Sequence, residues 1–386
     1  MASGYLTPTG TDREDLPQVV RLVRPAVDHL AAAAKLLDNP PPLPGEVSGS
    51  LPRWLEIADW WAAVRLHFAA APPASFNDAA VVTGQAWWNK TDTAWVAWLR
   101  AHYGAQLSRS HVTPATVDKI GAHLNHAAVV QGDKVLLLVM DGMGVAQWQY
   151  LRKVLNLTVA TDRRVLAMLP TITSVSRQAI FAGQLPTRFP DSINRTDAED
   201  RRWREFWIKA GLSDREVHYA RTPGRHAGDW PDLPDASVVG VAINAVDDLV
   251  HGSDVNDDHQ LLASLGTWAH AGLVPAALAW ARRHGHRVWL TADHGNVVSQ
   301  GLGQPIPNEG AAVPSRGIRV RQYANPVLRN VSKLPGIAWD PPGYPPTSRP
   351  LLFAPGSMCY RNSATLVTHG GLSLDEVVIP FVEVIP

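Results

Sequence analysis

The chain has 386 residues, which is enough for one large domain or two smaller ones with a well-buried core. Lysine plus arginine equals aspartate plus glutamate, 35 of each, so any surface that binds a polyanion has to be local. The single cysteine, Cys359, excludes a disulfide framework and a cysteine metal cluster. No basic and apolar leader opens the chain, and no apolar run approaches the roughly 20 residues that span a bilayer, so we expect a soluble cytoplasmic protein without a membrane partner.

The first third of the sequence predicts helices. A helix over Pro17–Leu37 runs into a proline-rich stretch, residues 39–50, which has to end the helix and which suggests a linker. From Leu51 to Ala128, apolar residues recur at intervals of three and four. Aromatic side chains at this spacing are more often core residues than residues that stack on nucleobases. They include Trp54, Trp60, Trp61, Trp87, Trp88, Trp95 and Trp98. We therefore expect a helical N-terminal region over residues 1–128.

The strongest strand signal lies at the start of the second region, residues 129–386. Six consecutive apolar residues, Val135–Met140, predict a strand that is buried on both faces, as in parallel α/β sheets. Asp141 follows directly and begins a glycine turn. Ligands of open α/β sheets bind at the carboxyl ends of strands, so Asp141 is a candidate metal ligand or catalytic acid, although an ordinary turn has the same composition.

The pattern of an apolar run that ends in acids or histidines repeats along the chain. Further runs of this kind are Val238–Ile243 before Asp247 and His251, Arg287–Ala292 before Asp293 and His294, and Thr365–Thr368 before His369. Residues 377–384 predict a last strand. If these strands lie side by side, the polar side chains meet at one edge of a mixed, mainly parallel sheet, and the fold class is α/β.

A corner rich in hydroxyl groups follows the first strand and a helix over Val145–Leu155. A second strand is expected over Arg164–Leu169, and then a short helix over Ser174–Ala182 that Gly183 would end. The hydroxyl groups of the corner belong to Thr171, Thr173, Ser174 and Ser176, with Thr173 expected at the N-cap. Such residues often only cap helices. A hydroxyl beside free N–H groups and the positive end of a helix dipole can also attack a phosphoryl group.

Taken together and in this order, these residues resemble the alkaline phosphatase superfamily. The local sequence is similar to PglZ, a component of phage-growth-limitation and BREX phage-defence systems. The resemblance spans about Trp54 to Val384, and its most specific motifs are Leu137–Met143, Leu169–Ala179 and Thr368–Phe381. It implies an alkaline-phosphatase-like catalytic domain over residues 129–386 and other phage-defence proteins as partners.

The resemblance also implies two sites for divalent metal ions. One would be held by Asp141, Thr173, Asp293 and His294, and the other by Asp247, His251 and His369. Carboxylate and imidazole ligands together suit zinc, with manganese as the alternative. The spacing of Asp247 and His251 puts both side chains on one face of a helical turn, and Asp248 is the alternative ligand if the register shifts by one residue.

The family pattern further implies that Thr173 is the metal-bound nucleophile. It lies ten residues before Gly183, the spacing found in phosphodiesterase-like members, and the other hydroxyls of the corner remain alternatives. Two cations about 4 Å apart lower the pKa of such a hydroxyl and stabilise the leaving oxygen. Arg177, four residues further along the helix, is either a catalytic residue that binds the substrate phosphate or a charge on the helix surface.

Two inserts would shape the access to this site. Residues 184–235 contain aromatic residues at 203, 206 and 207 that predict an amphipathic helix, and this insert would cap the site. In residues 297–350, an alternating pattern would place Arg319 and Arg321 on one face of a strand. Such a face would suit a polyanionic strand, or it is an ordinary solvated face.

We therefore predict a metal-dependent phosphoester hydrolase, a phosphodiesterase that acts on nucleotides or nucleic acid through Thr173 in anti-phage defence. One alternative is a non-catalytic scaffold or regulatory component of a BREX-like complex. Another is a phosphomonoesterase or phosphomutase relative. Sulfatase activity is not expected, because sulfatases of this superfamily need a cysteine or serine in a Cys/Ser-x-Pro-x-Arg setting and Cys359 does not stand in one. The sequence carries no signal for the oligomeric state.

Overall fold

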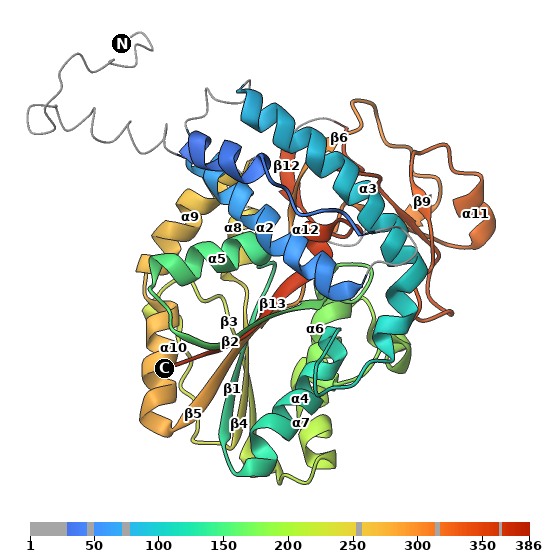
Figure 1. The fold of residues 1–386 in the computed structure, drawn as a ribbon. Helices are drawn as coiled ribbons and strands as arrows, with labels where there is room; N and C mark the ends of the chain where they lie inside the picture. Colours follow the sequence, from blue (N-terminus) through green and yellow to red (C-terminus); the bar gives the residue numbers. More distant parts are fainter. Residues whose placement is uncertain (1–28, 45–49, 72–77, 252–256, 313–316, 363–364) are drawn as a thin grey trace, which may run out of the picture.

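A computed structural model describes residues 29–44, 50–71, 78–251, 257–312, 317–362 and 365–386. Its centre is a six-stranded sheet with helices on both faces (Figure 1). In sheet order the strands are β2 (Val159–Leu166), β13 (Val378–Val384), β5 (His286–Ala292), β1 (Lys134–Met140), β4 (Val238–Ile243) and β3 (Val217–Thr222). The β5, β1, β4 and β3 strands are parallel, and β13 runs antiparallel to both β5 and β2. The predicted mixed, mainly parallel sheet is confirmed.

The register of the three central strands determines where the polar residues that follow each strand lie. Met140 of β1 pairs with Ile243 of β4 on one side and with Ala292 of β5 on the other. All residues of β1 after Lys134 are fully buried, because helices cover both faces of the sheet. The next residues, Asp141 and Asp293, therefore leave neighbouring strands at the same level.

Two groups of helices cover the sheet. One face carries α5 (Val145–Val154), α9 (Asp258–His270) and α10 (Leu273–His284), and the other carries α4 (Ile120–Ala127), α6 (Thr173–Ala182) and α7 (Glu199–Lys209) (Figure 1). A short helix, α8 (Ala245–Val250), follows β4. Among the described residues no single helix is long and apolar enough to cross a membrane, whereas α9 and α10 pass that test together with a bend of 41°.

Two predicted boundaries around the hydroxyl-rich corner are wrong by a few residues. The strand expected over Arg164–Leu169 spans Val159–Leu166, so it begins five residues and ends three residues earlier than predicted. Its pairing with β13 is continued by one more bond, from the Ala167 N–H to the Val377 carbonyl. Helix α6 begins at Thr173, so Ile172 is the N-cap. Gly183 ends the helix as expected, in the left-handed conformation with φ 58°.

The N-terminal region is helical, as predicted. Residues 29–37 are helical, and α2 (Leu51–Ala70) and α3 (Ala79–Leu107) lie across one end of the molecule (Figure 1). Residues 17–28 of the predicted first helix lie outside the described residues. Trp54, Trp95 and Trp98 are at most 1% exposed and belong to the same hydrophobic core as the central sheet. The interpretation as core residues is confirmed for these three and for Trp61 and Trp88, whereas Trp60 and Trp87 are partly buried and pack against the core. Each buried tryptophan contributes about 2 kcal/mol or more.

Two small sheets lie beside the central one. The first consists of β7 (Ala311–Ala312), β8 (Val320–Tyr323), β10 (Leu351–Phe353) and β9 (Ile337–Ala338), and the second of β11 (Met358–Cys359), β6 (Val297–Gly301) and β12 (Thr365–Thr368). The expectation that Thr365–Thr368 lies beside the other ligand-bearing strands is wrong. It pairs antiparallel with β6, with Thr368 opposite Val297, and this pairing still brings His369 back to the end of β5. The remaining helices are α11 (Pro326–Asn330) and α12 (Leu374–Val377).

The expected basic face on the second insert is also wrong. Arg319 and Arg321 are 1% and 2% exposed. The Arg319 guanidinium donates to Glu376 at 3.0 Å and to the Ser299 hydroxyl at 3.1 Å. Arg321 lies over the ring of Tyr323. Both arginines contact partners inside the protein, so they form neither a surface that could bind a polyanion nor a solvated strand face.

A buried carboxylate between α3 and α12 makes the stability of the fold pH-dependent. Asp92 accepts a hydrogen bond from the backbone N–H of Leu374 at 2.9 Å, and burial raises its pKa from 3.8 to about 7. The folded chain therefore holds this proton more tightly than the unfolded chain does. Its stabilising effect is complete below about pH 4 and is lost as the pH rises through about 7.

We expect Asp92→Asn to remove this loss, because the amide oxygen keeps the Leu374 hydrogen bond and cannot ionise. Urea unfolding at several pH values should show the variant gaining on the wild-type chain as the pH rises from about 4 to about 8. The gain is bounded by about 1.4 kcal/mol per unit of pKa shift. A constant difference between the two chains over this range would contradict the assignment.

Candidate active site

Two buried carboxylates stand side by side at the ends of β1 and β5. Asp293 accepts hydrogen bonds through Oδ1 from the backbone N–H groups of Gly142 at 3.0 Å and His294 at 2.9 Å. Its Oδ2 is buried and has no hydrogen-bond partner among the described residues. Burial, and then the charge of Asp141, raise the pKa of Asp293 well above its usual value. A buried carboxylate oxygen without a donor is the natural ligand of a cation.

Two histidines stack at the same edge with their ring centroids 3.9 Å apart. His294 Nδ1 lies 3.0 Å from the Gly295 carbonyl oxygen, and His369 Nδ1 lies 2.8 Å from that of Thr171. Because a carbonyl only accepts, each Nδ1 carries the hydrogen and each Nε2 keeps its lone pair, the arrangement of metal-binding histidines. Burial and then the neighbouring His294 lower the pKa of His369 well below its usual value, which favours the neutral, metal-binding form.

Asp247 lies on α8 and His251 is the C-cap residue of that helix, one turn further on, as the four-residue spacing predicts. His251 Nε2 lies 3.1 Å from Asp247 Oδ1, and His369 Nε2 lies 3.8 Å from the same oxygen. Burial opposes the ionisation of Asp247, but the surrounding histidines hold its pKa below the usual range. Asp247 is 3% exposed, whereas its neighbour Asp248 is half-buried and lies outside both candidate ligand groups.

These side chains form two groups whose ligand atoms lie within 4.8 Å of one another, namely Asp141, Asp293 and His294, and Asp247, His294 and His369. The groups fit two adjacent cations, and the identity of the metal is open to zinc and manganese alike. The sequence assigned His294 to one site, whereas the geometry places it in reach of both. His251 contacts Asp247 at the margin of the second group.

Among the four hydroxyls of the corner, that of Thr173 faces these ligands. Its Oγ1 lies 3.3 Å from Asp141 Oδ1 and 3.2 Å from His294 Nε2. The other hydroxyls donate to backbone carbonyls: Thr171 to Gly371, Ser174 to Ile193 and Ser176 to Met168. Thr173 is the first residue of α6, where backbone N–H groups without helical partners favour an anion. The role of nucleophile stays a prediction, and the geometry agrees best with Thr173.

Arg177 is fully buried behind Asp141, so the alternative of a charge on the helix surface is wrong. Its Nη1 donates to Asp141 Oδ2 at 2.8 Å, and its Nε donates to Glu199 Oε1 at 2.7 Å. Burial alone would lower the pKa of Arg177, but Asp141 and Glu199 raise it, so the guanidinium stays charged. Arg177 thus holds one oxygen of Asp141 while the other faces Thr173. Its contact with a substrate phosphate stays a prediction.

The sequence did not predict three residues that contact Arg177 or the turn after Asp141. Glu199 begins α7 in the first insert and is 1% exposed, and Asn244 accepts from Arg177 at 3.1 Å. Asn296 donates to the Gly142 carbonyl at 2.7 Å. An acidic residue in the first turn of a helix is usually explained by the helix dipole, so the sequence did not indicate that Glu199 contacts Arg177. Asn296 follows the Asp293-His294-Gly295 motif and could have been noticed there. The capping role of the insert stays a prediction.

The comparison with protein families identifies the chain. Residues 123–384 match the model described as the BREX system PglZ alkaline phosphatase-like domain. The chain belongs to the PglZ family. The predicted resemblance and fold are therefore confirmed, and PglZ membership makes the chain part of a phage-defence system with other proteins. Comparison with curated protein sequences finds no match.

Several solved structures are similar to this PglZ-family chain at low sequence identity. Murine ectonucleotide pyrophosphatase/phosphodiesterase 5 is 13% identical, with a TM-score of 0.47 over 65% of this chain and 88% of that one. The human counterpart is 14% identical, with a TM-score of 0.42 over 65% and 87%. Phosphonoacetate hydrolase from Sinorhizobium meliloti, in complex with phosphonoformate, is 9% identical, with a TM-score of 0.41 over 65% and 89%.

The candidate metal sites predict a stabilisation by divalent cations. Manganese or zinc added to metal-free protein should raise the midpoint of thermal unfolding, by the equivalent of about 2.7 kcal/mol at a concentration one hundred times the dissociation constant. His369→Ala should remove most of this rise. His123→Ala, on α4 against Phe381, is the matched control and should keep it. An equal rise in the His369 variant would contradict the assignment.

The Arg177 clamp predicts a large contribution of Glu199 to stability. Glu199→Gln leaves the buried guanidinium with one carboxylate fewer, and breaking such a pair costs about 3 to 5 kcal/mol. Urea unfolding measures this loss. Glu205→Gln on the same helix removes an ion pair with Arg201 that is more than half exposed, and it should cost less than about 1 kcal/mol. Equal losses would show that the burial of the Arg177 pair has no energetic consequence.

Proposed function

We propose that this PglZ-family chain is a metal-dependent phosphodiesterase that acts on nucleotides or nucleic acid in the cytoplasm during anti-phage defence. The observation that carries the proposal is the place of Thr173. Its hydroxyl lies within 3.3 Å of Asp141 and His294, and His294 belongs to both groups of buried metal-type ligands. A hydroxyl that serves only to cap a helix needs no such surroundings.

The proposed reaction begins with attack of the Thr173 oxygen on the phosphorus atom. A bond forms between Oγ1 and phosphorus, the ester bond to the leaving alcohol breaks, and water then releases phosphate ester from the threonine. Two bound cations, zinc or manganese, would supply activation of the hydroxyl and stabilisation of the leaving oxygen. Asp141 and His294 orient the hydroxyl but would serve as metal ligands, so its proton would pass through solvent to the leaving alcohol oxygen. The N–H groups at the start of α6 hold the phosphoryl oxygens.

Arg177 supports this chemistry by fixing Asp141. It donates to Asp141 Oδ2 and leaves Oδ1 directed at Thr173. This contact keeps Thr173 and the carboxylate that orients it at a constant distance, which an attack geometry needs.

The substitution Thr173→Ala tests the nucleophile. With an aryl phosphodiester and added manganese or zinc, we expect turnover to fall on the order of a thousandfold or more. Ser174→Ala is the matched control from the same helix turn and should keep turnover within about threefold, because its hydroxyl donates to the Ile193 carbonyl instead of facing the ligands. Unchanged turnover in the Thr173 variant would refute the assignment.

A panel of diesters and monoesters, assayed on the same preparation, tests the proposed class of reaction. A preference for diesters supports the proposal, and a preference for monoesters makes the chain a phosphomonoesterase. Absence of hydrolysis, combined with partner binding that Asp293→Ala retains, would favour a scaffold role in the BREX complex.

A further inference from the structure

The segment that follows His369 packs tightly against the turns that follow Asp141 and His294. The backbone N–H of Gly295 donates to the Glu376 carbonyl at 2.9 Å. A Cβ atom added to Gly295 would lie 2.0 Å from the Asp375 carbonyl oxygen, so a larger residue does not fit there. Gly144 lies against the same oxygen, at 3.4 Å from its own added Cβ. The start of α12 thus packs directly on the turns after His294 and Asp141.

The N-terminal helices hold this segment through three polar contacts. Trp95 Nε1 donates to the Leu372 carbonyl at 2.9 Å, and Asp92 accepts from the Leu374 N–H at 2.9 Å. Arg65 of α2 pairs with Asp375, with 3.0 Å between Nη1 and Oδ1. All three contacts fall within four residues that begin three positions after His369. They come from a part of the chain that contributes no candidate metal ligand.

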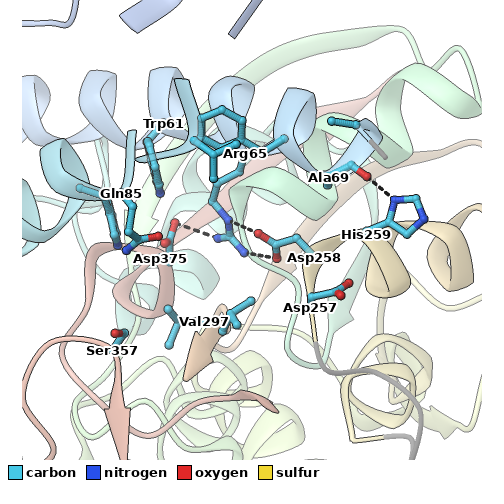
Figure 2. A pocket seen from close by; sticks show the side chains of 15 residues that line it. Trp61, Arg65, Ala69, Gln85, Asp257, Asp258, His259, Val297, Ser357 and Asp375 are labelled. Carbon is cyan, nitrogen blue, oxygen red and sulfur yellow. Dashed lines mark hydrogen bonds and ion pairs between the residues drawn. The ribbon is translucent and has the colours of Figure 1, made fainter. Parts of the chain in front are cut away.

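Arg65 also reaches the segment downstream of the other histidine of the second site. Its Nε and Nη2 donate to the two oxygens of Asp258, at 2.9 and 2.6 Å. Asp258 begins α9, seven residues after His251. Figure 2 shows the Arg65 guanidinium between Asp258 and Asp375, below α2 and beside Trp61. A single buried arginine therefore bridges the chain segments that follow His251 and His369.

The planar guanidinium is suited to this position. It offers donors in two directions at a fixed angle, so it can hold one carboxylate bidentately and a second one from its other edge. Arg65 is 8% exposed, and the Asp375 and Asp258 side chains are 11% and 23% exposed. A pocket of about 220 Å³ lies beside them, also lined by Trp88 and Ser357. A lysine ammonium could reach one of the two carboxylates but would not reproduce the fork.

We propose that Arg65 is a positioning residue for the second metal site, formed by Asp247, His294 and His369 with His251 at its margin. Arg65 ties α9 and α12 to α2, and these two helices follow His251 and His369 in the chain. The position of both histidines, and with it the affinity for metal, therefore depends on the helical N-terminal region. This inference rests on the proposed function and adds to it the role of a region outside the site.

The test compares Arg65→Met with Arg164→Met in the full chain. Arg164 is a matched control, because it is equally buried and ties α2 to the central sheet through Asp59. Its other partner, Asp162, lies on its own strand β2, and among the described residues none of its hydrogen bonds or ion pairs reaches the segments after the histidines. Titration calorimetry with manganese measures metal affinity, thermal unfolding measures stability, and steady-state kinetics separate kcat from KM.

We expect Arg65→Met to weaken manganese binding about tenfold or more and to lower kcat with little change in KM, as is typical for the loss of a group that orients metal ligands. Arg164→Met should lower the unfolding midpoint by a similar amount and keep manganese affinity within about twofold. Arg65→Lys should fall between the wild-type chain and Arg65→Met in affinity. It also serves as the test variant if Arg65→Met does not fold.

Wild-type manganese affinity in Arg65→Met, or in Arg65→Lys if only that variant folds, would overturn the proposal. An equal loss of affinity in Arg164→Met would overturn it too, because any loosening of α2 would then suffice. Metal affinity is read separately from turnover. A wild-type chain that binds manganese and hydrolyses no phosphoester would therefore contradict the proposed function and leave the effect of Arg65 on metal binding intact.

Discussion

The site depends on the burial of carboxylates at neighbouring strand ends. Asp141, Asp247 and Asp293 are at most 4% exposed, and a buried carboxylate without compensation costs several kcal/mol. Arg177 compensates Asp141 from behind. The pKa of Asp293 is raised because the free-energy cost of burying its charge is not compensated, and the neutral histidines beside it cannot compensate it. Cations between these side chains would, which is the physical reason to regard the edge as a metal centre and not as a polar patch.

Two buried ion pairs brace this edge from opposite sides. Glu199 holds Arg177 behind Asp141, and Arg319 holds Glu376, whose carboxylate also accepts from the backbone N–H of Gly371 after the His369 ligand. In each pair one partner comes from an insert into the core. The inserts therefore stabilise the ligand-bearing turns, in addition to any role in substrate binding. The N-terminal helices add the Arg65 bridge on a third side.

Much of the fold was visible in the sequence because the signal is local. The run Val135–Met140 is apolar throughout, and a strand buried on both faces needs no distant information to be recognised. Asp141 and the other candidate ligands were predicted because each follows the end of a predicted strand. Long-range contacts had no such signal. An alternating pattern does not tell whether Arg321 faces solvent or the interior, and the partner of Arg177 lies 22 residues away in an insert. The same limit applies to Thr365–Thr368, whose pattern predicts a strand but not its sheet.

The central claim is that Asp141, Thr173, Asp293 and their histidine neighbours hold two cations. Anomalous scattering from crystals of the full chain, grown with manganese or zinc and recorded on both sides of the metal absorption edge, tests it most directly. The account requires two anomalous peaks about 4 Å apart, one beside Asp141 and Asp293 and one beside Asp247 and His369. Peaks only at surface histidines, or no peak at the ends of β1 and β5, would contradict it.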